Sequence, residues 1–307
     1  MRRGPYQHWS GSPMMAESEE KMVQQAPRHA SSTGQGFTEG AWLDVHFEAA
    51  RPEYEAQLRA VGIQPSWRVL DAACGSGSFL PTLAELVGPQ GHLAALDLAP
   101  ENVALVEQRP PLPCPVEARA GTVLDLPYTD HSFDAVWFAN TSQYLTDAEL
   151  TTALQEFRRV VRPGGLVAVK EVDSTLTRIL PAPPGLILRW FDALARTGMV
   201  QSTGGLRGPA LTGWLRRAGL AGIWQRCTLI ERTTPLDAFP RQFWRDLLTG
   251  MSGRAPSLDL SPEDQKVWAR LRDPAALDAY LDVPDFYGCE GNILTVGTVP
   301  EDSNDRE

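Results

Sequence analysis

The sequence predicts an α/β fold in which helices cover both faces of a mainly parallel β-sheet. Short apolar runs alternate with segments of helical period, from WRVLDA at residue 67 to LVAVKEV at residue 166. This alternation is typical of βαβ units, and apolar runs of this length suit strands buried on both faces. A loop rich in glycine follows the first of these strands, which is a common position for a ligand site.

Composition restricts the class of protein. The chain has 307 residues, of which 43% are hydrophobic and 21% are charged. A chain of this size can bury about 75% of its unfolded surface. The apolar fraction is ordinary for a globular protein, which excludes a wholly disordered or a fibrous protein. The sequence contains no apolar run of about 18 residues that could span a membrane. The first thirty residues also lack the apolar core of a signal peptide, and we therefore expect a cytoplasmic protein without membrane insertion.

Charge and cysteine spacing narrow the choice of partners. The net charge is −10, and the sequence has no Lys/Arg stripe. Because an acidic chain repels a phosphate backbone, we do not expect a nucleic-acid partner. The four cysteines form no CxxC pair and no Cys/His cluster, so we expect free thiols in a reducing compartment and no metal site.

The N-terminal region differs from the rest of the chain. Residues 1–36 are rich in Ser, Gly, Gln, Met and Pro without any helical or strand period, which predicts a disordered or loosely attached tail. Residues 37–66 have a helical pattern and predict N-terminal cap helices. Pro52 is expected to divide this segment into two helices because proline lacks the backbone N–H.

Residues 67–234 are expected to form the core, followed by an insertion and a last strand. The strand candidates in the core are WRVLDA, HLAALDL, VEARAG, FDAVWFAN, LVAVKEV and IWQRCTLIERT. The helix candidates between them include FLPTLAELV, ENVALVEQ, ELTTALQEFRRVV, PGLILRWFDALARTG and LRGPALTGWLRRAGL. Residues 235–288 contain helical pieces rich in Trp and Phe, and residues 289–300 contain the β-branched run NILTVGTV. We predict that the helical pieces are inserted between the final two strands.

The segment VLDAACGSGSF, residues 69–79, is the most informative part of the sequence. Gly75 and Gly77 have no Cβ, so a ligand can approach the backbone closely. The helix that follows begins with unpaired N–H groups, which favour a carboxylate or a phosphate. Asp97 stands twenty residues after Gly77, at the end of the next strand candidate. It is therefore expected to accept hydrogen bonds from the hydroxyls of a ribose.

Two cofactor classes fit a glycine loop of this kind. A dinucleotide site requires GxGxxG, and this sequence has Leu80 in place of the third glycine. Asp71 precedes the loop, and its carboxylate would repel a pyrophosphate but attract an ammonium or a sulfonium. S-adenosylmethionine carries both of these cations and no phosphate, so the charges favour it over NAD. An NAD-dependent oxidoreductase remains the alternative.

The sequence resembles the class I S-adenosylmethionine-dependent methyltransferases, in the branch of ubiquinone/menaquinone-biosynthesis and natural-product enzymes. The resemblance runs from about Trp67 to Val169. Four ordered segments carry it: VLDAACGSG, LAALDLAPENV, GTVLDLPYTDHSFDAVWFAN and EFRRVVRPGGLVAV. It implies a Rossmann-like, seven-stranded, mostly parallel sheet with an antiparallel last strand. It also implies that residues 235–288 form a helical lid insertion.

The resemblance also implies the residues that bind the cofactor. The methionine part would be framed by Asp71, Ala73, Gly75 and Gly77. Asp97 would bind the ribose, and the adenine would lie against Leu98, Thr122 and Val123. Asn140 would lie near the sulfonium and the substrate. Ala73 stands where the family usually has glycine. Thr122 stands where the family more often has aspartate, and an uncharged hydroxyl there weakens the contact with the adenine amino group.

The family comparison leaves the methyl acceptor open. We expect in-line transfer to a small, partly apolar metabolite of a secondary-metabolite or quinone-like class, by a metal-independent monomer or homodimer. The candidates for a catalytic group are Glu171, His46 and Tyr144. A cofactor-binding protein of the same fold that does not transfer methyl groups is a further alternative.

Overall fold

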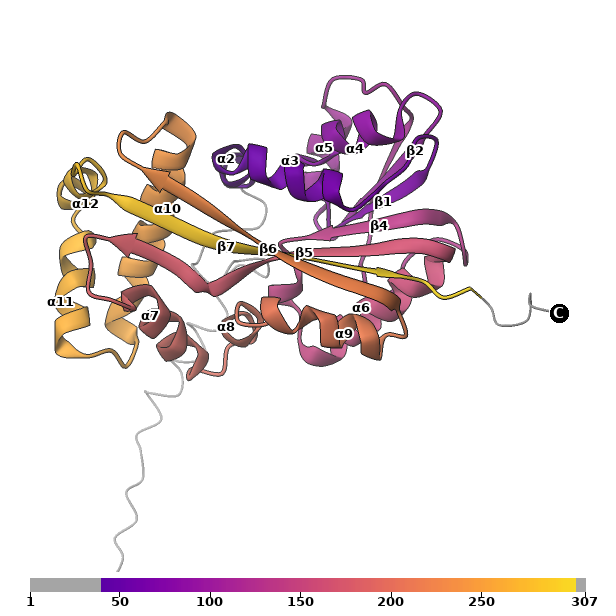
Figure 1. Cartoon of the computed structure of the whole chain (residues 1–307). Coiled ribbons are helices and arrows are strands. Elements are labelled where there is room, and N and C mark those ends of the chain that lie inside the picture. The colour runs from indigo at the N-terminus through magenta and orange to yellow at the C-terminus, as the bar shows by residue number, and fades with distance from the viewer. Residues whose placement is uncertain (1–39, 302–307) are drawn as a thin grey trace, which may run out of the picture.

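The computed structural model describes residues 40–301, and the predicted tail at residues 1–36 lies outside this range. A seven-stranded sheet with the order β3-β2-β1-β4-β5-β7-β6 crosses the molecule (Figure 1). Its strands are β1 (Arg68–Ala72), β2 (His92–Asp97), β3 (Val116–Ala120), β4 (Phe133–Ala139), β5 (Val161–Leu180), β6 (Ala221–Thr233) and β7 (Tyr287–Thr298). The strands from β3 to β5 pair in parallel, whereas β7 is antiparallel to β5 and to β6. The predicted fold class, with its antiparallel last strand, is confirmed.

Helices cover both faces of the sheet (Figure 1). One face carries α3 (Arg51–Ala60), α4 (Leu80–Val87) and α5 (Pro100–Glu107), and the other carries α6 (Asp147–Val160) and α9 (Leu211–Arg217). Strand β4 shows how one sequence serves both faces. Trp137 is buried in the first apolar cluster and the neighbouring Phe138 in the second, because successive side chains of a strand point to opposite sides.

Two helices that precede β1 in the chain lie over the carboxyl edge of the sheet. Helix α2 (Gly40–Ala49) and α3 meet at Ala50, and Pro52 lies in the first turn of α3, where its missing N–H costs no hydrogen bond. Strand β6 holds this bend through Arg232. Its guanidinium donates to the carbonyl oxygen of Ala49 at 2.7 Å and pairs with the carboxylate of Glu53 at 2.7 Å.

Strand β5 is much longer than the run LVAVKEV predicts. It extends over 20 residues, and its pairing with β7 reaches Leu180 opposite Tyr287 after a register shift between Asp173 and Arg178. Helix α7 (Leu186–Ala195) packs on this extension. Three further helices share an apolar cluster with α7: α10 (Ala238–Arg254), α11 (Pro262–Leu271) and α12 (Pro274–Leu281). The last three lie between β6 and β7 in the chain. Together the four helices bury a third apolar cluster that includes Trp190, Trp244 and Trp268.

The remaining elements are short. They are α8 (Val200–Gly204) and three single 3₁₀ turns, η1 (Ser142–Tyr144), η2 (Gly208–Ala210) and η3 (Ala255–Ser257). The first of these turns follows β4 and lies beside the site described below. Within residues 40–301, no helix combines the length and the apolar character that crossing a membrane requires.

Candidate functional site

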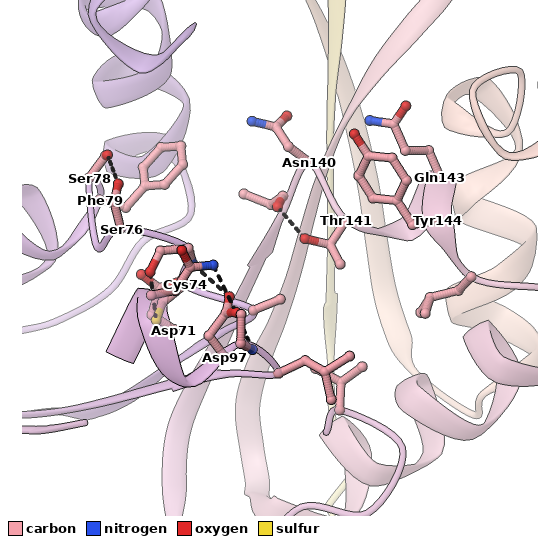
Figure 2. Close-up of a pocket in the computed structure, with 18 of the residues that line it drawn as sticks. Asp71, Cys74, Ser76, Ser78, Phe79, Asp97, Asn140, Thr141, Gln143 and Tyr144 are labelled. Carbon is pink, nitrogen blue, oxygen red and sulfur yellow. Dashed lines mark hydrogen bonds between the residues drawn. The ribbon is translucent and has the colours of Figure 1, made fainter. Parts of the chain in front are cut away.

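A cavity of about 450 Å³ opens at the carboxyl ends of β1, β2 and β4. This edge is where open α/β sheets bind their ligands. Figure 2 shows Asp71, Cys74 and Asp97 on one side of the cavity and Asn140, Gln143 and Tyr144 on the other. Ten of the twelve residues singled out by the sequence line it: His46, Asp71, Ala73, Gly75, Asp97, Leu98, Thr122, Val123, Asn140 and Tyr144. Gly77 and Glu171 are not part of its lining.

The glycine loop reverses the chain between β1 and α4 through left-handed backbone conformations. The φ angle is +57° at Ala73, +54° at Gly75 and +80° at Gly77. A Cβ atom on Gly77 would lie 2.7 Å from Cδ1 of Leu80 and 2.9 Å from Cγ2 of Val106. Gly77 itself is not part of the cavity lining. This glycine lets the loop pack against α4 and α5, and its neighbours form the cavity wall.

Asp97 connects the glycine loop to the start of α5. Its Oδ2 accepts a hydrogen bond from the backbone N–H of Gly75 at 2.8 Å. Its Oδ1 accepts from the backbone N–H of Ala99 at 2.9 Å and from Nδ2 of Asn102 at 3.0 Å. A carboxylate oxygen can accept two hydrogen bonds, so Oδ2 retains a lone pair for a ligand hydroxyl. The side chain thus shapes the loop and also faces the cavity.

Asp71 lies at the end of β1, buried beneath the glycine loop. Its Oδ2 accepts no hydrogen bond from the described residues. Burial and the nearby Asp97 raise the pKa of Asp71 well above its ordinary range. A buried oxygen without a donor is costly, and a ligand ammonium at this end of the cavity would supply the donor and the positive charge. The residues present therefore fit the amino group of S-adenosylmethionine.

The rim of the cavity next to β2 and β3 combines apolar side chains with the hydroxyl of Thr122. The side chain of Leu98 is 59% exposed, although the residue lines the cavity. Thr122 Oγ1 accepts a hydrogen bond from the backbone N–H of Leu124 at 3.2 Å, which fixes the loop after β3. The hydroxyl keeps one lone pair and its proton for another partner. A flat ring with polar edges, such as adenine, suits these two surfaces.

The opposite end of the cavity combines residues from the cap helices and from the end of β4. His46 Nε2 lies 3.1 Å from the hydroxyl of Tyr54, and the imidazole stacks on Phe243 of α10 at a centroid distance of 5.2 Å. Burial, with a smaller effect of Lys170, lowers the pKa of His46 to about 3, so the ring is neutral at physiological pH. Burial also raises the pKa of Tyr144. Neither group is charged at this end.

Glu171, predicted as a possible base, is fully buried and is not part of the cavity lining. Its carboxylate accepts from the Ser142 hydroxyl at 2.8 Å and from the backbone N–H groups of Gln143 and Val172 at 3.0 and 2.9 Å. The side-chain amide of Gln143 donates a fourth bond at 3.2 Å. A carboxylate with these partners holds the turn that leads to Tyr144. The geometry therefore does not support Glu171 as the base that contacts an acceptor.

Sequence reasoning missed three residues around the cavity. Asp44 of α2 accepts hydrogen bonds from the hydroxyls of Ser76 and Ser78 at 2.8 and 2.9 Å. Tyr54 lines the cavity beside His46. Lys170 is buried directly beneath Asn140, to which it donates at 2.5 Å. Asp44 and Tyr54 give no sequence signal, but a lysine inside the apolar run LVAVKEV is visible in the sequence.

Comparisons with known proteins identify a methyltransferase domain in the segment that carries the cavity. Residues 69–165 match a family described as "Methyltransferase domain". The demethylmenaquinone methyltransferase of Lactobacillus johnsonii is 30% identical over 168 residues, which are 48% of this chain and 66% of that protein. An uncharacterized 37.1 kDa protein in transposon Tn4556 of Streptomyces fradiae is 35% identical over 126 residues, or 41% of this chain and 36% of that protein. The chain thus spans less than two thirds of the length of these curated relatives.

A solved structure shares the fold. It is a candidate methyltransferase of Bacillus halodurans C-125, with a TM-score of 0.51 and 15% identity over 80% of this chain and 98% of that chain. The fold, the cavity and the matched segment define a class I methyltransferase domain. The matched segment is similar to S-adenosylmethionine-dependent methyltransferases, among them a demethylmenaquinone methyltransferase. S-adenosylmethionine is the cofactor of this class.

Proposed function

We propose that this protein transfers a methyl group from S-adenosylmethionine to a small, partly apolar metabolite of a secondary-metabolite or quinone-like class. The observation that carries the proposal is a single cavity with two chemically different ends. One end offers carboxylates and a left-handed glycine loop for a cationic cofactor. The other is lined by His46, Tyr54 and Tyr144 under the cap helices, which suits an uncharged acceptor with aromatic or apolar surface.

Each residue of the cofactor end has a role in this proposal. Asp71 would receive the ammonium group of the cofactor, and the loop from Ala73 to Gly75 would follow its methionine part. Asp97 would accept from a ribose hydroxyl through the remaining lone pair of Oδ2. Leu98 would cover the adenine, with Thr122 and Val123 along its edge. The opposite charges of Asp71 and the cofactor support this orientation.

When bound, S-adenosylmethionine supplies a methyl group on a sulfonium for in-line displacement by the acceptor. The protein then has to align the acceptor and exclude water, and alignment alone contributes about 7–11 kcal/mol to lowering a barrier. The cap helices and residues 235–288 would form the lid over the acceptor, since His46 of α2 stacks on Phe243 of α10. Asn140, at the end of β4, would lie next to the reacting atoms.

The proposal also includes the acceptor class and the location and oligomeric state of the protein. The quinone-like acceptor class is supported by the similarity to a demethylmenaquinone methyltransferase, and the secondary-metabolite class by the resemblance of the motifs. The chain would act in the cytoplasm as a monomer or homodimer, without nucleic acid, membrane insertion or metal.

Calorimetric titration of the purified protein tests the cofactor first. We expect micromolar binding of S-adenosylmethionine and S-adenosylhomocysteine and no binding of NAD(H). Acceptor screening with isotopically labelled S-adenosylmethionine then tests transfer, with phenols, naphthoquinols and polyketide-like compounds as probes. Binding of NAD(H) alone would contradict the proposal. Cofactor binding without transfer to any probe would favour the alternative of a non-methylating protein.

A further inference from the structure

The segment that joins β4 to α6 forms much of the wall at the acceptor end. It comprises residues 141–145, contains η1, and is called the β4–α6 turn below. Four of its five residues line the cavity: Thr141, Gln143, Tyr144 and Leu145 (Figure 2). A short connecting segment has no apolar core of its own. Its position therefore depends on contacts with other parts of the chain.

Arg207, between α8 and η2, binds the carbonyl groups of this turn. Its Nη1 donates to the carbonyl oxygens of Ser142 at 2.7 Å and of Leu145 at 3.0 Å. Its Nη2 donates to Oδ1 of Asp147 at 2.7 Å, and the guanidinium lies 5.4 Å from the ring centroid of Trp214. All three hydrogen bonds thus end on the β4–α6 turn or on the first residue of α6.

The burial of Arg207 shows which of these bonds matter. The side chain of Arg207 is 6% exposed, whereas that of Asp147 is 79% exposed. A buried charge is costly unless its donors find acceptors, and an ion pair with an exposed carboxylate contributes little. The carbonyl oxygens of Ser142 and Leu145 are therefore the partners that hold the guanidinium in its buried position.

Glu171 binds the donors of the same turn. Its carboxyl oxygens accept from the hydroxyl of Ser142 and from the backbone N–H and the side-chain amide of Gln143. A guanidinium has donors and no acceptor, so Arg207 binds the carbonyl groups and leaves the N–H groups to Glu171. The two side chains come from different parts of the chain and fix the turn through complementary groups.

Helix α8 adds a close backbone contact next to Arg207. A Cβ atom on Gly204 would collide with the carbonyl oxygen of Gln143, so only glycine fits at this position. The backbone N–H of Arg207 donates to the carbonyl oxygen of Gly204 at 3.0 Å. One tight segment therefore supplies both the steric contact with Gln143 and the guanidinium.

We propose that Arg207 is a positioning residue for the acceptor end, which holds the β4–α6 turn so that Gln143 and Tyr144 face the cavity. Arg207 itself is not part of the cavity lining and acts through the turn. A wall that is held in place before binding selects an acceptor by its fit to a preformed surface. This assignment rests on the proposed function, in which the turn forms the acceptor wall.

The environment of Tyr144 tests the positioning role without any ligand. Protein labelled with 3-fluorotyrosine gives ¹⁹F NMR signals for its tyrosines, and Tyr144→Phe assigns the signal of Tyr144. We expect Arg207→Met to shift or broaden this signal, because the turn loses both carbonyl bonds. Asp147→Asn removes only the exposed ion pair, so its Tyr144 signal should match that of the wild type. An unchanged Tyr144 signal in Arg207→Met would overturn the proposal.

Arg159→Met is the matched control for a general loss of stability. Arg159 also donates to two backbone carbonyl oxygens, those of Tyr128 at 2.7 Å and Leu126 at 3.1 Å, in the loop before β4. We expect Arg159→Met to move the Tyr128 signal, assigned from Tyr128→Phe, and to leave the Tyr144 signal unchanged. Equal movement of the Tyr144 signal in both arginine variants would show that Arg207 acts only through overall stability.

Arg207→Lys keeps the proposal testable if Arg207→Met does not fold. Lysine retains the positive charge but lacks the fixed fork of donors that reaches Ser142, Leu145 and Asp147 together. We expect the Tyr144 signal to move in Arg207→Lys as well. A Tyr144 signal identical to that of the wild type would show that charge alone is required, and the positioning role of the guanidinium would be overturned.

Methyl transfer tests the consequence for the acceptor. The probes are the phenols, naphthoquinols and polyketide-like compounds of the acceptor screen, with isotopically labelled S-adenosylmethionine. We expect kcat/KM for a methylated probe to fall about 100-fold in Arg207→Met, because a misplaced wall misaligns the acceptor. The affinity for S-adenosylhomocysteine, measured by calorimetry, should stay close to that of the wild type, because Asp71 and Asp97 keep their contacts. Unchanged turnover in Arg207→Met would overturn the role in acceptor positioning.

The outcomes separate this assignment from the proposed function. If the wild type bound no S-adenosylhomocysteine and methylated no probe, the proposed function and the acceptor selection would both be overturned. The ¹⁹F signals of Tyr144 would then still decide whether Arg207 positions the β4–α6 turn. If the wild type methylated a probe and Arg207→Met changed neither turnover nor the Tyr144 signal, only the role of Arg207 would be overturned.

Discussion

The two ends of the cavity are built on different principles. At the cofactor end, each wall segment directly follows a strand, and backbone groups provide the key bonds, as in the contact between the Gly75 N–H and Asp97. At the acceptor end, the walls come from distant parts of the chain, as in the stacking of His46 on Phe243. Side chains such as Lys170 and Asn140 provide the bonds there. Substitutions should therefore damage the cofactor end through loop geometry and the acceptor end through buried charge.

The largest effect is expected for Asp97→Ala at the cofactor end. The substitution removes three hydrogen bonds, from Gly75, Ala99 and Asn102, and also the oxygen that we propose accepts from the ribose. Each bond to a charged group contributes about 1.5–3 kcal/mol. We expect the affinity for S-adenosylhomocysteine, measured by calorimetry, to fall at least about 100-fold.

Asp125→Asn is the control for this loss, because Asp125 is an exposed residue near the same edge of the sheet. Its affinity should match that of the wild type. If Asp97→Ala bound the ligand within a few-fold of the wild type, the cofactor end would not depend on this carboxylate. Loss of the loop hydrogen bonds would then not be what damages the cofactor end.

Buried charge at the acceptor end predicts a dependence of stability on pH. Burial lowers the pKa of Lys170 from 10.5 to about 7. Between these values the unfolded chain binds the proton and the native state does not, so raising the pH stabilises the native state. The free energy of unfolding of the wild type, measured relative to Lys170→Met by denaturant titration, should rise by roughly 3 kcal/mol from pH 7 to pH 10.

Glu290 should give the opposite slope in a lower pH range. Burial raises the pKa of Glu290 from 4.5 to about 7. The native state holds the proton between these values, so the stability of the wild type relative to Glu290→Gln should fall as the pH rises from 4.5 to 7. Flat differences for both variants would mean that neither group changes its pKa on folding, and the acceptor end would not be governed by buried charge.

The different construction of the two cavity ends also explains how much of the site could be predicted from the sequence. The cofactor end follows from a contiguous motif, so Asp71, Asp97 and the loop residues could be predicted from residue type and spacing. Gly77 was predicted to frame the ligand, and the structure places Leu80 and Val106 against it. Sequence spacing cannot distinguish a glycine that a ligand requires from one that Leu80 and Val106 require.

The acceptor end could be predicted only in part. Strand β5 continues beyond Val172 because β7, more than a hundred residues later, pairs with it, and no local pattern contains that partner. Asp44 contacts Ser76 and Ser78 only once the cap helix lies over the loop. Glu171 was predicted as a base from its position after a strand. Three of its four donors come from Ser142 and Gln143, in a turn that the sequence does not define.

Steric packing of the glycine loop can be measured separately from backbone strain. Gly77→Ala introduces a contact at 2.7 Å at a φ of +80°, whereas Gly62→Ala introduces a side chain at a φ of +91° with no atom within 4 Å. A left-handed conformation costs about 1–2 kcal/mol for a residue with a Cβ. We expect Gly62→Ala to lose about that much unfolding free energy and Gly77→Ala about 1 kcal/mol more. Equal losses would show that Leu80 and Val106 move away freely.

The smallest effect is expected where the two ends meet, at Asp44. This residue joins cap helix α2 to the glycine loop through Ser76, Ser78 and Arg109, and its side chain is 52% exposed. Asp44 does not line the cavity itself, and Asp44→Ala removes its contacts with Ser76 and Ser78, which do, so the cap should open more often over a bound cofactor. We expect the dissociation rate of S-adenosylhomocysteine, followed by stopped-flow tryptophan fluorescence, to rise about 10-fold, which corresponds to about 1.4 kcal/mol.

Glu48→Ala provides the comparison for Asp44→Ala, because Glu48 lies one turn further along α2 and pairs with Arg51 instead of the loop. Its dissociation rate should equal that of the wild type. Equal acceleration in both variants would mean that α2 acts through its overall stability. Faster dissociation in Asp44→Ala alone would mean that the cap helix holds the cofactor end through a single carboxylate. The two ends of the cavity would then be coupled despite their different construction.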